Sequence, residues 1–201
     1  MSSNLELAVA AYKKGLTDLN DMVRHTEYEI VNGSQSGLVV ENVNFFTKSF
    51  LISACAHLEM CIKEIVFFVA TDIDQRLVKA AIPQSIVDWR LNQKKKQDGI
   101  NHLVIGMTKR EVDDLVSGNV YRTKDALSLV GVNLAHKPAD WETWKDIIQT
   151  IVTRRNNIVH HNDDASNLSF ADVRSHISSM IQYIDFIVES CGRSVVARNG
   201  Q

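Results

Sequence analysis

The scarcity of helix-breaking residues is the feature that most constrains this chain. Its 201 residues include only two prolines and nine glycines, the residue types that most disfavour a helix interior. Along much of the chain, apolar residues recur every three or four positions, as in Leu5, Val9, Tyr12 and Leu16, which is the spacing of one helix face. Hydrophobic residues make up 45% of the sequence, which is enough to build a core. We therefore expect an all-α fold, with residues 1–201 forming one domain.

The spacing predicts long helices towards both ends of the chain and short ones between them. The long helices are expected over 5–31, 41–71, 140–161 and 169–192, with Asp140 as the N-cap of the third and a frayed tail over 193–201. Short helices are expected over 72–80, 84–91, 101–106, 108–117 and 123–130. Thr108 and Glu111 form a capping-box pattern. We interpret residues 72–138 as a short-helix insertion between two long helical pairs.

The charge and the cysteine content of the chain argue against several classes of protein. The formal net charge is −2, so no overall positive field indicates a nucleic-acid binder, although a local positive groove remains compatible with it. The three cysteines form no CxxC pair, which argues against a disulfide framework and against a metal site of that kind. The apolar segment 45–70 is interrupted by charged residues, and the first residues lack a signal-peptide pattern. We expect a cytoplasmic protein with no cofactor and no membrane segment.

One polar cluster carries the chemical information in the sequence. Arg155, Asn156 and His160 stand near the end of an amphipathic helix, before a polar turn and another long helix. A helix turns about 100° per residue, so Asn156 and His160 share a face, whereas Arg155 and His160 do not quite share one. Both can serve one site if the helix ends or distorts near His160, or if two copies face each other across a symmetry axis. The sequence leaves both arrangements open.

These residue types suit RNA cleavage without a metal, in which the 2′-hydroxyl attacks the adjacent phosphorus. Histidine titrates near neutral pH and suits general acid–base work. Arginine carries a permanent charge on a planar fork that matches phosphate. Asparagine can orient the imidazole or donate to a phosphate oxygen. The competing interpretation is a polar helix terminus, because histidine and arginine both interact favourably with the helix dipole there.

The motif also resembles a known family. Residues 155–160, Arg-Asn-Asn-Ile-Val-His, resemble the R-N-x-x-x-H motif of the HEPN superfamily. Residues 168–173, which lead into the last helix, are similar to that superfamily as well. Residues 50–59 resemble the RiboL-PSP-HEPN branch, which tends to carry an acid about where Glu59 stands. Together with the long helices that carry them, these stretches cover about half of the chain, and residues 72–138 add nothing to the resemblance.

The resemblance implies an up-and-down HEPN-type helical bundle that dimerises, with the motif helices of two copies forming one composite site. Active members cleave RNA without metal in toxin–antitoxin, phage-defence and CRISPR-linked systems. Carried over, Arg155 and His160 are the catalytic pair and Asn156 their polar support, while RNA and an antitoxin or regulatory protein are the expected partners. Some relatives have lost catalysis and bind RNA, a nucleotide or a protein, and this alternative stays open. A third hypothesis, an unrelated interaction domain, predicts that Arg155 and His160 lie apart with no shared cleft.

Weaker candidates surround the motif. Glu59 can orient Arg155 or form an i,i+4 ion pair with Lys63, and the pair is the favoured interpretation. Arg154 can contact an RNA backbone or serve only as a surface residue. His161 can supply a second proton-handling group, but a solvated turn is favoured.

Two further features outside the motif have a functional and a structural interpretation. Lys94, Lys95 and Lys96 can grip phosphates, although a solvated turn is the default for such a run. Trp141 and Trp144 can stack bases, but a pair at helical spacing is more typical of a core or a dimer interface.

Overall fold

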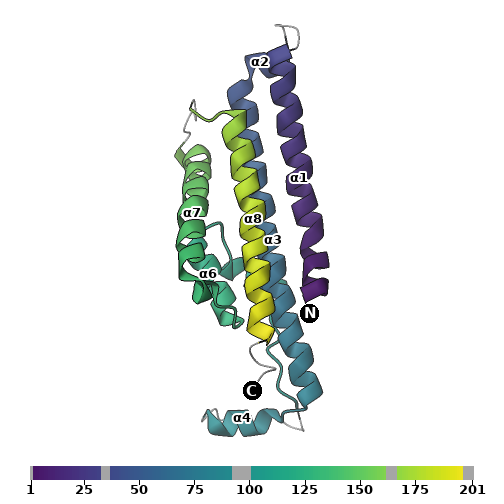
Figure 1. Cartoon of the computed structure of the whole chain (residues 1–201). Coiled ribbons are helices and arrows are strands. Elements are labelled where there is room, and N and C mark those ends of the chain that lie inside the picture. Colours follow the sequence, from purple (N-terminus) through teal and green to yellow (C-terminus); the bar gives the residue numbers. More distant parts are fainter. Residues whose placement is uncertain (1, 33–36, 92–100, 162–166, 197–201) are drawn as a thin grey trace.

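The computed structural model describes residues 2–32, 37–91, 101–161 and 167–196, and the fold of these segments is all-α. The four long helices are α1 (Ser2–Asn32), α3 (Val43–Ala80), α7 (Pro138–His161) and α8 (Phe170–Val196). They run alternately up and down. Helices α1, α3 and α8 lie side by side, and α7 packs against α3 and α8 (Figure 1). The expected all-α helical bundle is confirmed.

Helix α3 is the centre of the bundle because its apolar residues cover more than one side. It contacts α1, α7 and α8, and its buried positions include Leu51, Leu58 and Ile65. Helix α1 approaches it closely at Gly15, where a Cβ atom would lie 2.9 Å from Cδ2 of His57. The close approach of the two helices therefore depends on a glycine at this position.

The expected boundary at residue 71 is wrong, because α3 continues to Ala80. Neither glycine nor proline occurs between 71 and 80, and Asp72 pairs with Arg76 one turn later, with Oδ2 and Nε 2.9 Å apart. The helix ends where Ala81 adopts a left-handed conformation with φ 50°. Residues 72–80 thus belong to the central helix and not to the insertion.

The short helix expected over 101–106 is also absent. These residues instead form an extended segment that runs beside the junction of α3 and α4 (Gln84–Arg90). The backbone N–H of Leu103 donates to the carbonyl of Ile82 at 2.8 Å, and the N–H of Gly106 donates to Asp74 Oδ2 at 2.9 Å. The segment satisfies its backbone groups through these long-range bonds, which local propensity does not reveal.

Three short helices follow the predictions more closely, namely α4, α5 (Lys109–Leu115) and α6 (Val120–Leu129). The short helix α2 (Leu38–Glu41) and the 3-10 helix η1 (Leu134–His136) were not predicted. The capping box at the start of α5 is confirmed, with the Glu111 carboxylate accepting from the Thr108 N–H at 2.7 Å. Helix α6 begins three residues before the predicted start, because Asn119 caps it.

The predicted start of α7 and the predicted end of α8 both need correction. Helix α7 begins at Pro138, so Asp140 lies in its first turn and does not cap it. Proline suits that first position because it has no N–H to leave unsatisfied. Helix α8 begins after Ser169 as expected but continues past Gly192 to Val196. A single glycine lowers helix stability by only about 1 kcal/mol, and the well-packed turns before it carry the helix through. Residues 197–201 lie outside the described residues.

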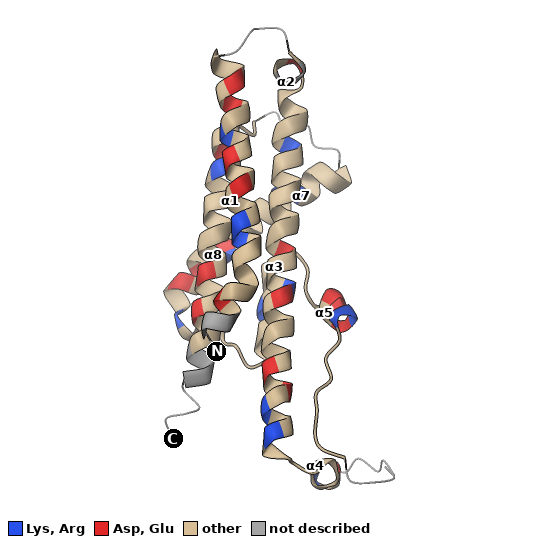
Figure 2. Cartoon of the chain, turned by 90° about the vertical axis from the view of Figure 1, so that its right-hand side faces the viewer, with Lys and Arg blue, Asp and Glu red and all other residues tan. Residues whose placement is uncertain are grey.

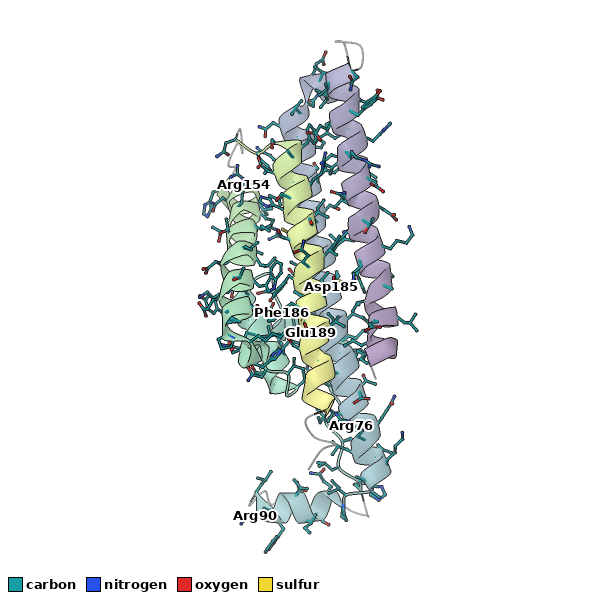
Figure 3. All side chains as sticks on the ribbon, in the orientation of Figure 1. Arg76, Arg90, Arg154, Asp185, Phe186 and Glu189 are labelled. Carbon is teal, nitrogen blue, oxygen red and sulfur yellow. The ribbon has the colours of Figure 1, made fainter. Side chains whose placement is uncertain are left out.

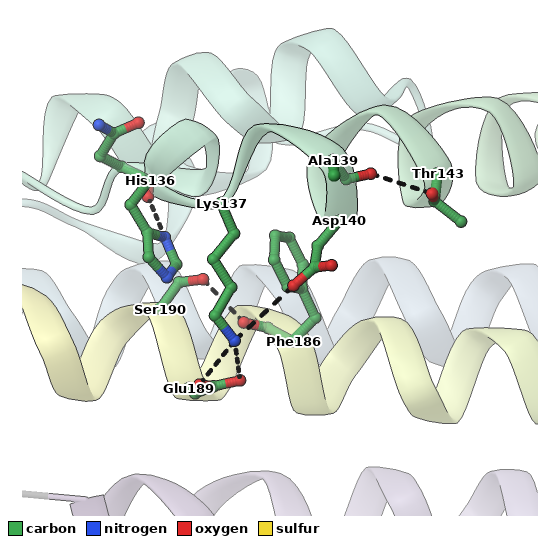
Figure 4. Close-up of polar contacts among 9 residues, drawn as sticks. His136, Lys137, Ala139, Asp140, Thr143, Phe186, Glu189 and Ser190 are labelled. Atoms are coloured by element: carbon green, nitrogen blue, oxygen red, sulfur yellow. Dashed lines mark hydrogen bonds and ion pairs between the residues drawn. The ribbon is translucent and has the colours of Figure 1, made fainter.

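The start of α7 is tied to α8 by a cluster of polar and ring contacts (Figure 4). Nζ of Lys137 lies 3.0 Å from Oε1 of Glu189 and 3.7 Å from Oδ2 of Asp140. The His136 ring stacks on Phe186 with an interplanar angle of 7°. These contacts fix the position of α7 along α8, and they therefore fix which of its side chains face the bundle.

The two tryptophans of α7 serve the core. Trp141 is buried, with Lys124 Nζ 5.2 Å from its ring centroid, and Trp144 packs on Tyr183.

Figure 2 shows acidic and basic residues interspersed along α1 and α3, with no broad face of one sign in that view. Within the described segments, no helix combines the length and the apolarity that crossing a lipid bilayer requires.

We predict that the α8 core carries much of the stability. Ile177 is fully buried, so Ile177→Ala should lower the free energy of unfolding by roughly 2–5 kcal/mol through lost burial and a cavity. The matched control, Leu7→Ala, removes an equally large side chain that is 73% exposed and should change stability by less than about 0.5 kcal/mol. Urea denaturation of both variants measures this, and equal losses would contradict the burial described here.

Candidate functional site

Helix α7 turns Arg155 and His160 in different directions. The side chains of Ile151, Val152 and Ile158 are buried against the bundle, and Arg155 projects from the same side and is half-buried. Five residues at about 100° each place His160 about 140° further round the helix, and its side chain is exposed. A single chain therefore does not bring the predicted catalytic pair into one cleft.

Arg155 instead lines a small cavity between α3, α7 and the turn that joins α5 to α6. The cavity has a volume of about 160 Å3. Its walls come from three parts of the chain, namely Cys55 and Glu59 of α3, Val152, Arg155 and Asn156 of α7, and Ser117, Gly118 and Asn119 of the turn. Sequence analysis missed these three turn residues, because no local pattern places the insertion beside the motif helix.

The guanidinium of Arg155 is only partly satisfied in this cavity. Its Nη1 donates to Oδ1 of Asn156 at 3.0 Å, so the two predicted motif residues are in contact. Its Nε is buried and has no hydrogen-bond partner among the described residues. An unpaired buried donor is costly, so such a group indicates a place for a ligand or an ordered water. The geometry favours an anion or a strong acceptor here.

Glu59 forms the ion pair that was the favoured interpretation of this residue. Its Oε1 lies 2.9 Å from Nζ of Lys63, which is the expected i,i+4 pair, and Lys63 also lies 3.2 Å from Oδ1 of Asp113. Glu59 also lines the cavity with Arg155, and its Oε2 faces the turn, 3.8 Å from the position of a Cβ on Gly118. The acid is thus held by one lysine and still faces the cavity.

Cys55 forms part of the apolar floor of the cavity. Burial raises the pKa of its thiol to about 12, while the nearby Arg155 opposes and Glu59 supports that rise. The thiol stays protonated at neutral pH and is a poor nucleophile. Cys55, Cys61 and Cys191 are all free and buried. No group of three or more His, Cys, Asp and Glu side chains within the described segments is placed to hold a metal ion.

Arg154 belongs to a second polar cluster, at the start of α8. Figure 3 shows it at the end of α7 beside that start, where its Nη2 donates to Oδ1 of Asn167. The Ser169 hydroxyl donates to Oδ2 of Asp172 at 2.7 Å, and this bond and that from the Ser169 N–H lower the pKa of the Asp172 carboxyl. His176, one turn beyond Asp172, also interacts with Arg154. Its i,i+4 spacing from Asp172 is the one sequence signal that points to this residue.

His161 and the lysine run over 94–96 are the remaining candidates from the sequence. His161 is exposed at the end of α7. Lys94, Lys95 and Lys96 lie outside the described residues. His57 is half-buried and keeps its Nδ1 2.9 Å from the carbonyl oxygen of Ser53, so it is a satisfied packing residue.

Comparisons with known proteins give one match. The model of a family described as RiboL-PSP-HEPN matches residues 16–193, which includes the middle region as well as the motif helix. Searches of curated proteins and of solved structures returned no match.

We predict that His176 makes stability depend on pH. Burial lowers its pKa below the ordinary 6.5, and Arg154 lowers it further, while Asp172 opposes both. The unfolded chain therefore binds a proton at this ring more readily than the folded chain does. The contribution of neutral His176 to the free energy of unfolding is present above pH 6.5 and is lost as the pH falls below it. His176→Gln should flatten that part of the curve of unfolding free energy against pH. An NMR titration of the ring gives the pKa directly, and a midpoint above 6.5 would contradict the assignment.

Proposed function

The chain belongs to the RiboL-PSP-HEPN family, and from that premise we propose that it is a metal-independent endoribonuclease that works as a homodimer. The observation that carries the proposal is the Arg155 guanidinium, which lines a cavity with a buried, unpaired Nε and with Asn156 beside it. Such a group suits the negative charge of a phosphate. The cavity walls at Ser117, Gly118 and Asn119 are partly exposed, so the site opens to solvent.

The proposed reaction needs only side-chain chemistry. A base removes the proton of the ribose 2′-hydroxyl, whose oxygen attacks the phosphorus. The bond to the 5′-oxygen breaks, and an acid returns a proton to that leaving oxygen. The products carry a 2′,3′-cyclic phosphate and a 5′-hydroxyl. His160 handles the protons, and Arg155 stabilises the charge that builds on the phosphoryl oxygens.

The divergence of the two side chains in one chain is the reason for proposing a dimer. His160 is exposed on the outer side of α7, so it is free to approach the cavity of a second copy. In an isologous pair, each cavity would combine Arg155 of one protomer with His160 of the partner subunit. This arrangement corresponds to the second of the two geometries that the motif spacing allows.

Membership of this family also suggests a biological role. We propose a cytoplasmic effector in a toxin–antitoxin or phage-defence system, restrained by an antitoxin or regulatory protein. The alternative is a non-catalytic module that binds RNA, a nucleotide or a protein, which the net charge of −2 favours. The two differ in turnover, which is measured directly.

We predict RNA cleavage by the purified protein in the presence of a chelator. Arg155→Ala and His160→Ala should each lower the rate by roughly a hundredfold or more, because one removes charge stabilisation and the other proton transfer. The control is Arg24→Ala, which removes an arginine whose side chain is 68% exposed on α1. A gel assay on a mixed RNA pool measures the rates. Full activity in both motif variants would remove the assignment, and no turnover by the wild type would favour the binding module.

A mixing experiment tests the composite site separately. Arg155→Ala and His160→Ala proteins, each inactive alone, are mixed and allowed to exchange subunits. Half of the dimers would be mixed, and one of their two sites would hold both intact residues, so activity should return to roughly a quarter of the wild-type level. Absence of any recovery, with subunit exchange verified by mass spectrometry, would show that both residues act from the same chain.

A further inference from the structure

The cavity beside Arg155 has features that a phosphate alone does not explain. It is too small for a drug-sized ligand, since such pockets span roughly 300–1,000 Å3 and this one has about 160 Å3. Cys55 and Val152 give it an apolar floor, while Glu59 places a carboxylate in its wall. A carboxylate repels phosphate, so a second, neutral group must face Glu59. A flat ring with an apolar face and polar edges suits this combination of walls.

We propose that this cavity is a subsite for a guanine base, with the Glu59 carboxylate as the group that selects it. The inference rests on the proposed ribonuclease function and names the base next to the bond that is cut. In this arrangement the ring lies over Cys55 and Val152, and the phosphate attached to its ribose lies at Arg155.

The choice of guanine follows from the hydrogen-bonding edges of the four bases. An ionised carboxylate only accepts hydrogen bonds. Guanine alone presents two adjacent donors, N1–H and N2–H, on the edge that proteins read in single-stranded RNA. Adenine and cytosine place a bare ring nitrogen beside their amino group, and uracil flanks its N–H with two carbonyl oxygens. Each of these would direct an acceptor at the carboxylate.

The turn supplies the complementary donor. Oδ1 of Asn119 accepts from the backbone N–H groups of Tyr121 and Arg122, at 2.9 and 3.2 Å. This leaves the Asn119 amide NH2 as the donor that the side chain can offer within the cavity it lines. It matches the O6 acceptor next to N1–H of guanine. The ion pair with Lys63 holds the Glu59 carboxylate in position.

The geometry of Gly118 offers a way to close the cavity. A Cβ added there would lie 3.4 Å from Cγ1 of Val152 and 3.8 Å from Oε2 of Glu59. The first distance is ordinary van der Waals contact, and the residue is not among those with a positive φ. Gly118→Ala should therefore fold normally and narrow the space, while Gly118→Leu should fill it.

The test is calorimetric titration of the full chain with the 3′-monophosphates of guanosine, adenosine, cytidine and uridine. The wild type should bind the guanosine nucleotide roughly tenfold or more tightly than the others, the discrimination expected of a good two-point contact to a base. Glu59→Gln should abolish that preference, and Gly118→Leu should abolish binding, with Gly118→Ala as the weaker variant if the leucine prevents folding. The matched control is Asp113→Asn, which removes the other carboxylate paired with Lys63 but none that lines the cavity; it should keep the preference.

The outcomes separate this inference from the proposed reaction. Equal affinity for the four nucleotides, no binding of any, or an unchanged preference in Glu59→Gln would overturn the guanine subsite. RNA cleavage that depends on Arg155 but shows no preference for guanosine would overturn it too, while leaving the ribonuclease assignment intact. Binding of the guanosine nucleotide through Glu59 without any RNA cleavage would support the subsite and refute the ribonuclease.

Discussion

The burial of one side of α7 against α3 and α8 governs the whole candidate site. Ile148, Ile151 and Ile158 form its apolar stripe, and the contacts of Lys137 with α8 hold its first turn. Because successive side chains project about 100° apart, burying this stripe turns Arg155 inwards together with it. The same rotation leaves His160 on the solvent side. The separation of the two motif residues is thus a consequence of packing the helix, and it is why the proposed reaction needs a second copy.

An arginine directed at the bundle interior is costly unless its charge and donors are satisfied. Here Asn156 takes one bond from Nη1, Glu59 lines the same cavity, and Nε remains without a partner among the described residues. A core built only for stability would place an apolar side chain at this position. The polar cavity is therefore the place where this fold departs from good packing, and such departures concentrate at functional sites.

The third wall of the cavity comes from the turn between the short helices α5 and α6. The turn over 117–119 is held in place by the ends of α5 and α6, and α5 packs against α3. Gly118 in this turn places no side chain between Glu59 and Val152, so the space beside the arginine stays open. The turn over 117–119 therefore determines the shape of the cavity beside Arg155. Substitutions in this turn would change which ligand fits the cavity without changing the helical bundle.

The sequence by itself determined the helical class, the approximate places of the four long helices and the capping box at Thr108, because each depends on local residue spacing. The ion pair of Glu59 with Lys63 was predictable for the same reason. Local pattern failed where distant contacts compete with it, as in the extended segment held by Asp74 and in the continuation of α8 past Gly192. Only the tertiary structure decided that Arg155 faces inwards, that Glu59 shares its cavity and that a turn some forty residues earlier closes it, since these depend on which faces of α3 and α7 are buried together.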